Sequence, residues 1–282
     1  MRALISRVYG PVEELSFADV PVPVPGPGQV LVRAQAAALN PIDVKLVTGA
    51  MRAAIPVTHP FVPGVDITGV VTRVGEGATR FAIGEPVLAW NGVRSGALAE
   101  YVIVDTGPAS ARRPDGLGPP RAAALATGAL TAAALIEAAA LGPDMTVLIV
   151  GAAGGLGSYA VQLTAQAGAR VIATGRATQS AFLGGLGADM VIDHTVAEVA
   201  PQLLNLLPAG ADVVIDLANA GPRLERSAAA ARAAGRLDEL AEQAARGALR
   251  VMIGATYDFA DARQALIDLA TQHSQGKVTI TF

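Results

Sequence analysis

A cluster of glycines follows an apolar run near the middle of the chain. Residues 146–158 are TVLIVGAAGGLGS, and a helical pattern follows them. Glycine lets the backbone turn tightly and lets a phosphate approach without meeting a Cβ atom, and the start of a helix offers unpaired N–H groups. The order of strand, turn and helix predicts a pyrophosphate site, formed by Gly151, Gly154, Gly155, Leu156 and Gly157. A glycine-rich turn without a ligand is the alternative.

The end of the next strand indicates which dinucleotide would bind. An acidic side chain there, about 20 residues past the glycines, would accept from the 2′-hydroxyl of NAD. The sequence instead has ATGR at residues 173–176, without an acid. Arg176 can pair with a 2′-phosphate through two N–H groups, and Thr174 and Gly175 leave room for it. We therefore predict NADP(H) as the cofactor, with a solvated loop arginine as the alternative.

The elements that would position this turn alternate between strands and helices. Short apolar strands are expected at residues 146–152, 170–174, 189–193 and 212–218. That pattern is typical of a doubly wound parallel sheet. The first third of the chain differs, because short apolar runs alternate there with glycine and proline. Such a density of short strands predicts a small β-barrel or sandwich.

The composition excludes several classes of protein. The chain has 282 residues, a formal charge of −3 and 4% aromatic residues. We expect no nucleic-acid partner, because such binding needs a basic surface and often aromatic stacking platforms. The chain has no cysteine, so disulfides, thiolate zinc sites and iron–sulfur clusters are excluded.

The start of the chain carries charges that interrupt any signal-peptide core, namely Arg2, Arg7, Glu13 and Glu14. We therefore expect a cytoplasmic protein. Residues 145–169 are uncharged and long enough to span a membrane. Their several glycines and polar side chains favour a soluble domain instead, so we expect no membrane partner.

Motifs spread along the chain resemble one family. They are ALNPID (38–43), PGVDITGV (63–70), AEY (99–101), GALTA (128–132), the glycine turn, LGAD with VID (186–193), and GKV (276–278). In this order they resemble the zinc-free branch of the medium-chain dehydrogenases/reductases, the quinone oxidoreductase and enone reductase group. The resemblance implies an α/β chain with a GroES-like, β-rich catalytic domain at residues 1–118, completed by residues 249–282. It also implies a Rossmann NADP(H)-binding domain at residues 119–248.

The same resemblance bears on metals. Zinc-dependent relatives carry a cysteine ligand where this chain has Asn40 and a histidine ligand where it has Val65. The three histidines are scattered without ligand spacing, at His59, His194 and His273. We expect no metal site. Stoichiometric metal in the purified protein would revive the alternative of a zinc alcohol dehydrogenase.

The family also implies roles for single residues. Asn40 would position the nicotinamide ribose or the substrate, with an ordinary turn asparagine as the alternative. The other implied cofactor contacts are Thr131, His194, Asn219 and Lys277, although relatives usually have glycine at position 219. Weaker candidates for a substrate pocket are Met51, Trp90, Arg94 and Tyr257. A structural or surface role is the alternative for each of them.

The chain departs from the family after its fourth Rossmann strand. The family continues with a helix, a turn and two further strands, but here AGRL at residues 234–237 leads straight into a segment that resembles a much later helix. We therefore expect a sheet without its last two strands. A true deletion, residues omitted near 235–238 and completion by another subunit are open explanations. A homodimer is also open, because the sixth strand is the family's usual dimer contact.

The implied activity is NADPH-dependent transfer of hydride to a quinone or an α,β-unsaturated carbonyl compound, without a metal. Negative charge would grow on the carbonyl oxygen and would need donors aimed at it. The sequence offers no clear general acid for this role. The alternative is a non-catalytic NADPH-binding protein of the same fold, acting as a redox sensor or a structural protein.

Overall fold

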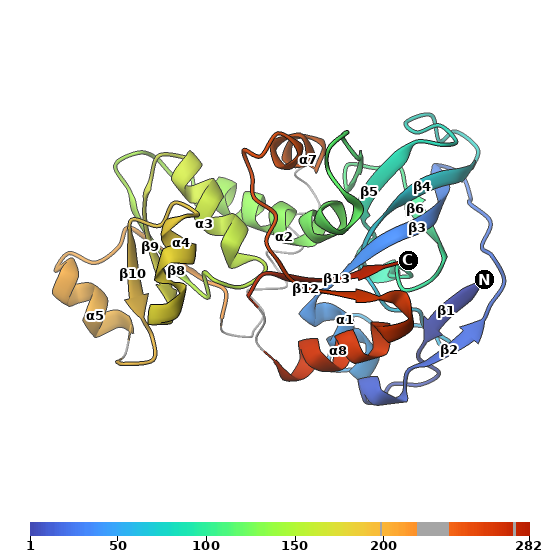
Figure 1. The fold of residues 1–282 in the computed structure, drawn as a ribbon, viewed down its shortest axis with the longest axis horizontal. Helices are drawn as coiled ribbons and strands as arrows, with labels where there is room; N and C mark the ends of the chain where they lie inside the picture. The colour runs from blue at the N-terminus through green and yellow to red at the C-terminus, as the bar shows by residue number, and fades with distance from the viewer. Residues whose placement is uncertain (198, 219–236, 273–274) are drawn as a thin grey trace. The chain divides into compact units, whose positions relative to one another are not determined.

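Figure 1 shows the computed structural model of the chain, which describes residues 1–197, 199–218, 237–272 and 275–282. The chain forms two compact units, Met1–Thr127 with Gly235–Phe282, and Gly128–Ala234. The sequence prediction places residues 119–127 and 235–248 in the second unit, whereas here they belong to the first. Hydrogen bonds account for this difference, because Thr127 donates to Asp66 and Arg121 donates to the carbonyl of Ala244.

The first unit is built on a seven-stranded sheet, which confirms the predicted β-rich first domain. Its strands are β3 (Gln29–Leu39), β4 (Asp66–Val74), β5 (Pro86–Trp90), β6 (Tyr101–Asp105), β7 (Ser110–Arg112), β12 (Ile253–Asp258) and β13 (Lys277–Thr281). Their order is β12-β13-β3-β4-β5-β7, and β6 also pairs with β3. Because β13 runs antiparallel to β3, the end of the chain shares a sheet with its first third (Figure 1). A smaller antiparallel pair consists of β1 (Arg2–Ile5) and β2 (Ser16–Asp19).

Strands β3 and β4 approach each other closely at Gly69. A Cβ atom at this position would lie 2.1 Å from the carbonyl oxygen of Arg33, so the pairing requires glycine. The register shifts at the same place, between Ala34 and Ala36 of β3. Apolar side chains of β3 such as Val32 and Leu39 then fill the core of the unit.

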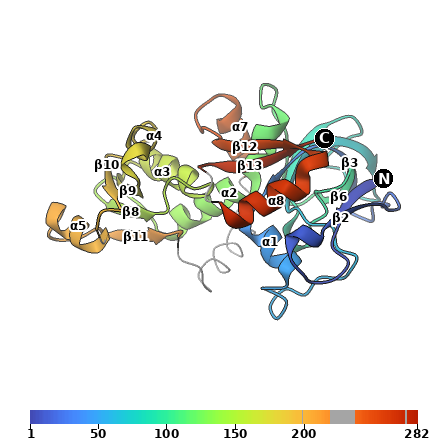
Figure 2. The same ribbon diagram turned by 60° about the horizontal axis from the view of Figure 1, so that its bottom comes forward.

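Helices cover this sheet. They are η1 (Val12–Glu14), α1 (Pro41–Thr48), η2 (Gly92–Arg94), α7 (Leu237–Ala245), η4 (Phe259–Asp261) and α8 (Ala262–Thr271). Helix α8 packs against α1, β12 and β13 (Figure 2) and buries Ala262, Ala265 and Leu266. Helix α1 begins at Pro41, whose fixed φ suits the first helical position, directly after Asn40.

Helix α2 (Pro119–Ala138) contains the boundary between the units. Among the described helices, it is the one long and apolar enough to cross a membrane by length and composition alone. About two-thirds (67%) of its most apolar 18-residue window is buried inside the protein. Residues 145–169, the span considered from the sequence, instead contain a strand, the glycine turn and a separate helix.

The second unit is a parallel sheet with helices. Its strands are β8 (Thr146–Val150), β9 (Arg170–Gly175), β10 (Met190–Asp193) and β11 (Val213–Asp216), in the order β10-β9-β8-β11. The helices are α3 (Gly157–Gln166), η3 (Ala177–Gln179), α4 (Ser180–Gly184) and α5 (Val199–Leu206). This confirms the predicted doubly wound sheet. Residues 219–236, which include Asn219, lie outside the described residues.

Candidate functional site

The glycine turn lies between the end of β8 and the start of α3. Gly151 has a φ of +80°, a left-handed conformation that favours glycine. A Cβ atom at Gly157 would lie 2.3 Å from the carbonyl oxygen of Gly151. The backbone therefore folds back on itself so tightly that neither position accepts a side chain without strain.

Three consecutive N–H groups of this turn form no hydrogen bond to the described residues. The amides of Gly155, Leu156 and Gly157 have no acceptor within the described part of the chain. Those of Gly154 and Ser158 donate to the carbonyls of Gly151 and Gly154, at 3.1 and 3.0 Å. Unpaired donors at a helix start form an anion site, so the residues present fit the pyrophosphate of a dinucleotide.

Thr174 fastens the turn to the neighbouring strand. Its side chain is 2% exposed, and its hydroxyl accepts from the N–H of Gly151 at 3.1 Å. The hydroxyl thus contacts the protein backbone, and its role in the structure is to hold the turn against the end of β9.

Arg176 and His194 follow two adjacent parallel strands, β9 and β10, and both are exposed. The backbone N–H of His194 donates to the carbonyl of Gly175 at 3.3 Å. Since the carboxyl ends of parallel strands share one edge of a sheet, the two residues lie at the edge where ligands bind in open α/β sheets. Within the described residues, no carboxylate forms an ion pair with Arg176.

Asp193 organises this edge and was not singled out by the sequence analysis. One of its carboxylate oxygens accepts from the N–H of Ala177 at 2.8 Å, and the other accepts from the N–H and hydroxyl of Thr195. These hydrogen bonds, the hydroxyl of Thr195 first, lower the pKa of Asp193 below its ordinary value. The carboxylate therefore ties the loop that carries Arg176 to the end of β10. In the sequence, Asp193 could have been noticed as the acidic residue at the end of the motif VID (191–193).

In the first unit, Asn40 belongs to a buried polar cluster. The residue is 5% exposed, and Lys277 is equally buried. The side-chain amide Nδ2 of Asn40 donates to Asp66 Oδ2 at 2.9 Å, and its Oδ1 accepts from Lys277 Nζ. Lys277 Nζ also forms an ion pair with Asp66 Oδ2 at 3.4 Å. The structure thus brings together two predicted residues that are 237 positions apart in the sequence.

The other oxygen of Asp66 extends the cluster to α2. Asp66 Oδ1 accepts from the backbone N–H of Thr127 at 3.0 Å and from its hydroxyl at 2.5 Å. Asp66 is fully buried. In the sequence Asp66 appears only within the motif PGVDITGV, which does not predict that it is the hub of the cluster.

Asp43 is the second buried carboxylate of this region. Its oxygens accept from the N–H of Asn40 at 2.7 Å and the N–H of Gly64 at 3.1 Å. Complete burial raises the pKa of Asp43 to about 7, and the charge of Asp66 adds to the rise. The backbone donors and Lys277 act in the opposite direction but are outweighed.

The structure places four further predicted residues as follows. Thr131 is buried in the part of α2 that belongs to the second unit. Met51 and Trp90 are half-buried in the first unit. The hydroxyl of Tyr257 donates to Asp268 Oδ2 at 2.6 Å, a bond that raises the pKa of the tyrosine.

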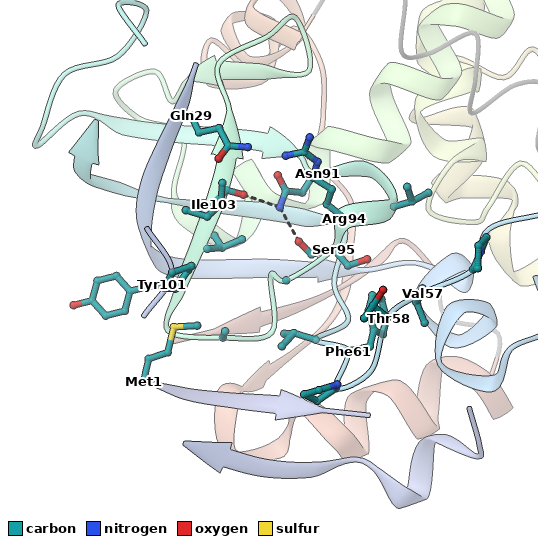
Figure 3. Close-up of a pocket in the computed structure, with 18 residues that line it drawn as sticks. Met1, Gln29, Val57, Thr58, Phe61, Asn91, Arg94, Ser95, Tyr101 and Ile103 are labelled. Carbon is teal, nitrogen blue, oxygen red and sulfur yellow. Dashed lines mark hydrogen bonds between the residues drawn. The ribbon is translucent and has the colours of Figure 1, made fainter. Parts of the chain in front are cut away.

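A cavity of about 610 Å³ opens in the first unit (Figure 3). Arg94 lines it, but Met51, Trp90 and Tyr257 do not. Asn91 holds its wall, because Nδ2 donates to the carbonyls of Ser95 at 2.7 Å and Ile103 at 2.9 Å. The cavity is therefore separate from most of the predicted substrate residues. Within the described ranges, no three His, Asp or Glu side chains are placed to hold a metal ion.

Three family models match the chain. The alcohol dehydrogenase GroES-like domain matches residues 26–111. Two models described as zinc-binding dehydrogenase match residues 155–247 and 229–280.

Curated relatives carry oxidoreductase names. The chain is 38% identical to a chloroplastic quinone-oxidoreductase homolog of Spinacia oleracea, over 68% of this chain and 60% of the relative. It is 37% identical to a chloroplast envelope quinone oxidoreductase homolog of Arabidopsis thaliana, over 79% of this chain and 69% of the relative. It is 31% identical to an Arabidopsis thaliana NADPH-dependent alkenal/one oxidoreductase, over 77% of this chain and 57% of the relative. The matched parts thus span between 57% and 69% of these relatives' own length.

Solved structures of oxidoreductases superpose on the whole chain. A quinone oxidoreductase from Coxiella burnetii superposes with a TM-score of 0.87 at 26% identity, covering 100% of this chain and 99% of that chain. A mycobacterial protein complexed with NADPH superposes with a TM-score of 0.82 at 25% identity, covering 100% of both chains. The chain belongs to the quinone oxidoreductase and enone reductase group of the medium-chain dehydrogenase/reductase superfamily.

Proposed function

We propose that this protein is an NADPH-dependent oxidoreductase that reduces quinones or α,β-unsaturated carbonyl compounds without a metal ion. The observation that carries the proposal is the row of N–H groups at Gly155, Leu156 and Gly157, at the start of α3, which have no acceptor among the residues that the structure describes. The names of the relatives and the NADPH-bound mycobacterial neighbour support it.

The preference for NADPH is assigned to Arg176. The residue follows β9 in a loop that Asp193 fixes through Ala177, and its guanidinium is exposed. A planar guanidinium matches the oxygens of a phosphate bidentately. No acidic residue stands between Thr174 and Arg176, so the 2′-hydroxyl of NAD would find no carboxylate there.

NADPH would supply the hydride. The chain would hold the pyrophosphate on the glycine turn, hold the 2′-phosphate with Arg176, and position the nicotinamide ribose or the substrate with Asn40. Catalysis would then depend on orientation and the exclusion of water. Because the hydroxyl of Tyr257 is already bonded to Asp268, this tyrosine is a poor donor to a substrate oxygen.

The test is NADPH oxidation with a panel of quinones and enones. Stimulation well above the background rate supports the proposal, and tight NADPH binding without turnover contradicts it. Activity that persists after metal chelation supports the metal-free mechanism, whereas stoichiometric zinc that is needed for turnover contradicts it.

The cofactor assignment is tested with two matched variants. Arg176→Ala should lower the NADPH over NADH preference at least tenfold. Arg170→Ala removes an exposed arginine at the opposite end of the same strand and should leave the preference unchanged. An unchanged preference in Arg176→Ala would refute the role of this residue.

A non-catalytic NADPH-binding protein is the second candidate. It is motivated by the departure from the family after the fourth Rossmann strand and by Asn219, a position at which relatives usually have glycine. This candidate predicts that NADPH protects the protein against thermal unfolding while no substrate of the panel is reduced. Measurable turnover excludes it.

A further inference from the structure

Lysine is rare in this chain, and one of its lysines is buried. The sequence has 21 basic residues, of which only Lys45 and Lys277 are lysines. Lys277 is 5% exposed, at the first position of β13. A buried cation needs partners to offset the loss of hydration. Almost all basic residues of the chain are arginines, yet a lysine stands at this buried position, where a positive charge is energetically unfavourable.

The surroundings of Lys277 explain why lysine is used. Three oxygens converge on its ammonium group: Asn40 Oδ1, the carbonyl of Leu39 at 3.4 Å and Asp66 Oδ2 at 3.4 Å. A compact ammonium with three donors matches three separate acceptors, whereas the rigid fork of a guanidinium suits a flat pair of oxygens. All three donors of Lys277 are thus directed at protein groups.

These contacts determine how the carboxamide of Asn40 is oriented. The cation lies at Oδ1 and the carboxylate of Asp66 lies at Nδ2, 2.9 Å away. The second N–H faces the carbonyl of Ala38 at 3.4 Å. Rotation by 180° would place an NH₂ group against an ammonium and an oxygen against a carboxylate, so one orientation is strongly favoured.

We propose that Lys277 is a positioning residue, which with Asp66 holds the Asn40 carboxamide so that only a lone pair of Oδ1 is left for a ligand. A carboxamide oxygen has two lone pairs and its nitrogen two protons; here both protons and one lone pair are engaged. Asn40 can then accept from a hydroxyl of the cofactor but cannot donate to the carbonyl oxygen of a substrate. This inference rests on the proposed function, in which Asn40 faces the cofactor or the substrate.

The orientation itself is tested without any turnover. The chain has four asparagines, so selective ¹⁵N labelling gives four side-chain NH₂ groups in an NMR spectrum. The protons of Asn40 should exchange with solvent at least 100-fold more slowly than those of the exposed Asn205. Lys277→Met should remove this protection. Exchange of Asn40 as fast as that of Asn205 in the parent protein would overturn the proposal, whether or not the protein is an enzyme.

The effect on the reaction is tested with steady-state kinetics. Lys277→Met should raise the KM for NADPH about 10- to 100-fold and leave the KM for the quinone or enone unchanged. A rise in the KM for the carbonyl substrate alone would overturn the proposal, because Asn40 would then face the substrate. If the parent protein shows no turnover, the proposed function fails, and the dissociation constant of NADPH takes the place of KM.

A double variant separates positioning from stability. Lys277→Met with Asp66→Asn removes both members of the buried ion pair, so the Asp66 carboxylate is not left without its cation. We therefore expect the melting temperature of the double variant to lie above that of Lys277→Met. The KM for NADPH should nevertheless stay raised, since no cation fixes the carboxamide. Recovery of the parent KM in the double variant would show that Lys277 is merely structural. Lys45→Met, which changes the other lysine, is the matched control and should behave like the parent.

Discussion

The stability of the first unit should fall as the pH rises through neutrality, because Asp43 must lose its proton while fully buried. The pKa of Asp43 is raised from 3.8 to about 7, chiefly by burial and then by the charge of Asp66. In the unfolded chain the same carboxyl ionises near pH 4. Between these two values the folded state binds a proton that the unfolded state does not bind. The free energy of unfolding therefore decreases with rising pH in this window.

The size of the effect follows from the two pKa values. A difference of one pKa unit corresponds to about 1.4 kcal/mol, so the rise to about 7 amounts to about 4 kcal/mol between pH 4 and pH 7. The stability contributed by the protonated carboxyl is fully present below pH 4 and is lost above pH 7. Asp268, whose pKa is lowered by the hydrogen bond from Tyr257, acts in the opposite direction at more acidic pH. The effects of Asp43 and Asp268 on stability therefore fall in different pH ranges.

The assay uses the single tryptophan of the chain. Trp90 lies in β5 of the first unit, so its fluorescence follows the unfolding of the unit that contains Asp43. Urea titrations between pH 4.5 and pH 8 give the free energy of unfolding at each pH. Asp43→Asn resembles the protonated acid in shape and charge, and its curve should be flat across this window. Asp19→Asn, at an exposed aspartate of β2, is the control and should keep the slope of the parent.

The stability curves of the parent protein and of Asp43→Asn should meet near pH 4.5 and diverge as the pH rises. Above pH 7, Asp43→Asn should be the more stable of the two. A parent protein whose stability stays constant or increases from pH 4.5 to pH 7.5 would refute the reasoning. So would a slope that survives in Asp43→Asn.

Three further substitutions test the glycine turn and the substrate side. Gly157→Ala places a methyl group 2.3 Å from the carbonyl oxygen of Gly151, so NADPH binding measured by calorimetry should be lost; retained affinity would contradict the geometry. Thr174→Val removes the acceptor of the Gly151 N–H and should cost about 1 kcal/mol of stability together with a several-fold loss of NADPH affinity. Tyr257→Phe should cost at most about 1 kcal/mol and leave kcat/KM unchanged. A large loss of activity would restore Tyr257 as a substrate residue.

The features that the sequence predicted are those with local signals. The glycine turn was found because strand, glycines and helix follow one another within 13 residues, and the turn in the structure has that order. The parallel sheet was found in the same way, from four short apolar runs. Arg176 was identified by its distance from the turn along the chain. Its attachment through Asp193 to β10 was missed, because that contact joins two loops 16 residues apart.

The buried cluster around Asn40 could not be found from local patterns. Lys277 alternates with apolar residues in KVTITF, a pattern that is typical of a strand with one exposed face. In the structure Thr279 is buried on that face together with Lys277. The pairing of β13 with β3 brings the lysine to Asn40, and no local pattern specifies that pairing. The usable signal was compositional: a lysine is unusual in a chain so rich in arginine.

Lys277 has two roles, to position the Asn40 carboxamide and to stabilise the fold, and these roles should depend differently on pH. Asp43 accepts from the backbone N–H of Asn40 and not from its side chain, so ionisation of Asp43 leaves the partners of the carboxamide unchanged. The raised KM of Lys277→Met should therefore be the same at pH 6 and pH 8. The stability of that variant should respond differently, since the charge of Lys277 holds down the pKa of Asp43 and its removal leaves two buried carboxylates without a cation. The loss of stability should be larger at pH 8 than at pH 5.5, whereas a KM effect that follows the same pH dependence would mean that Lys277 acts only through folding.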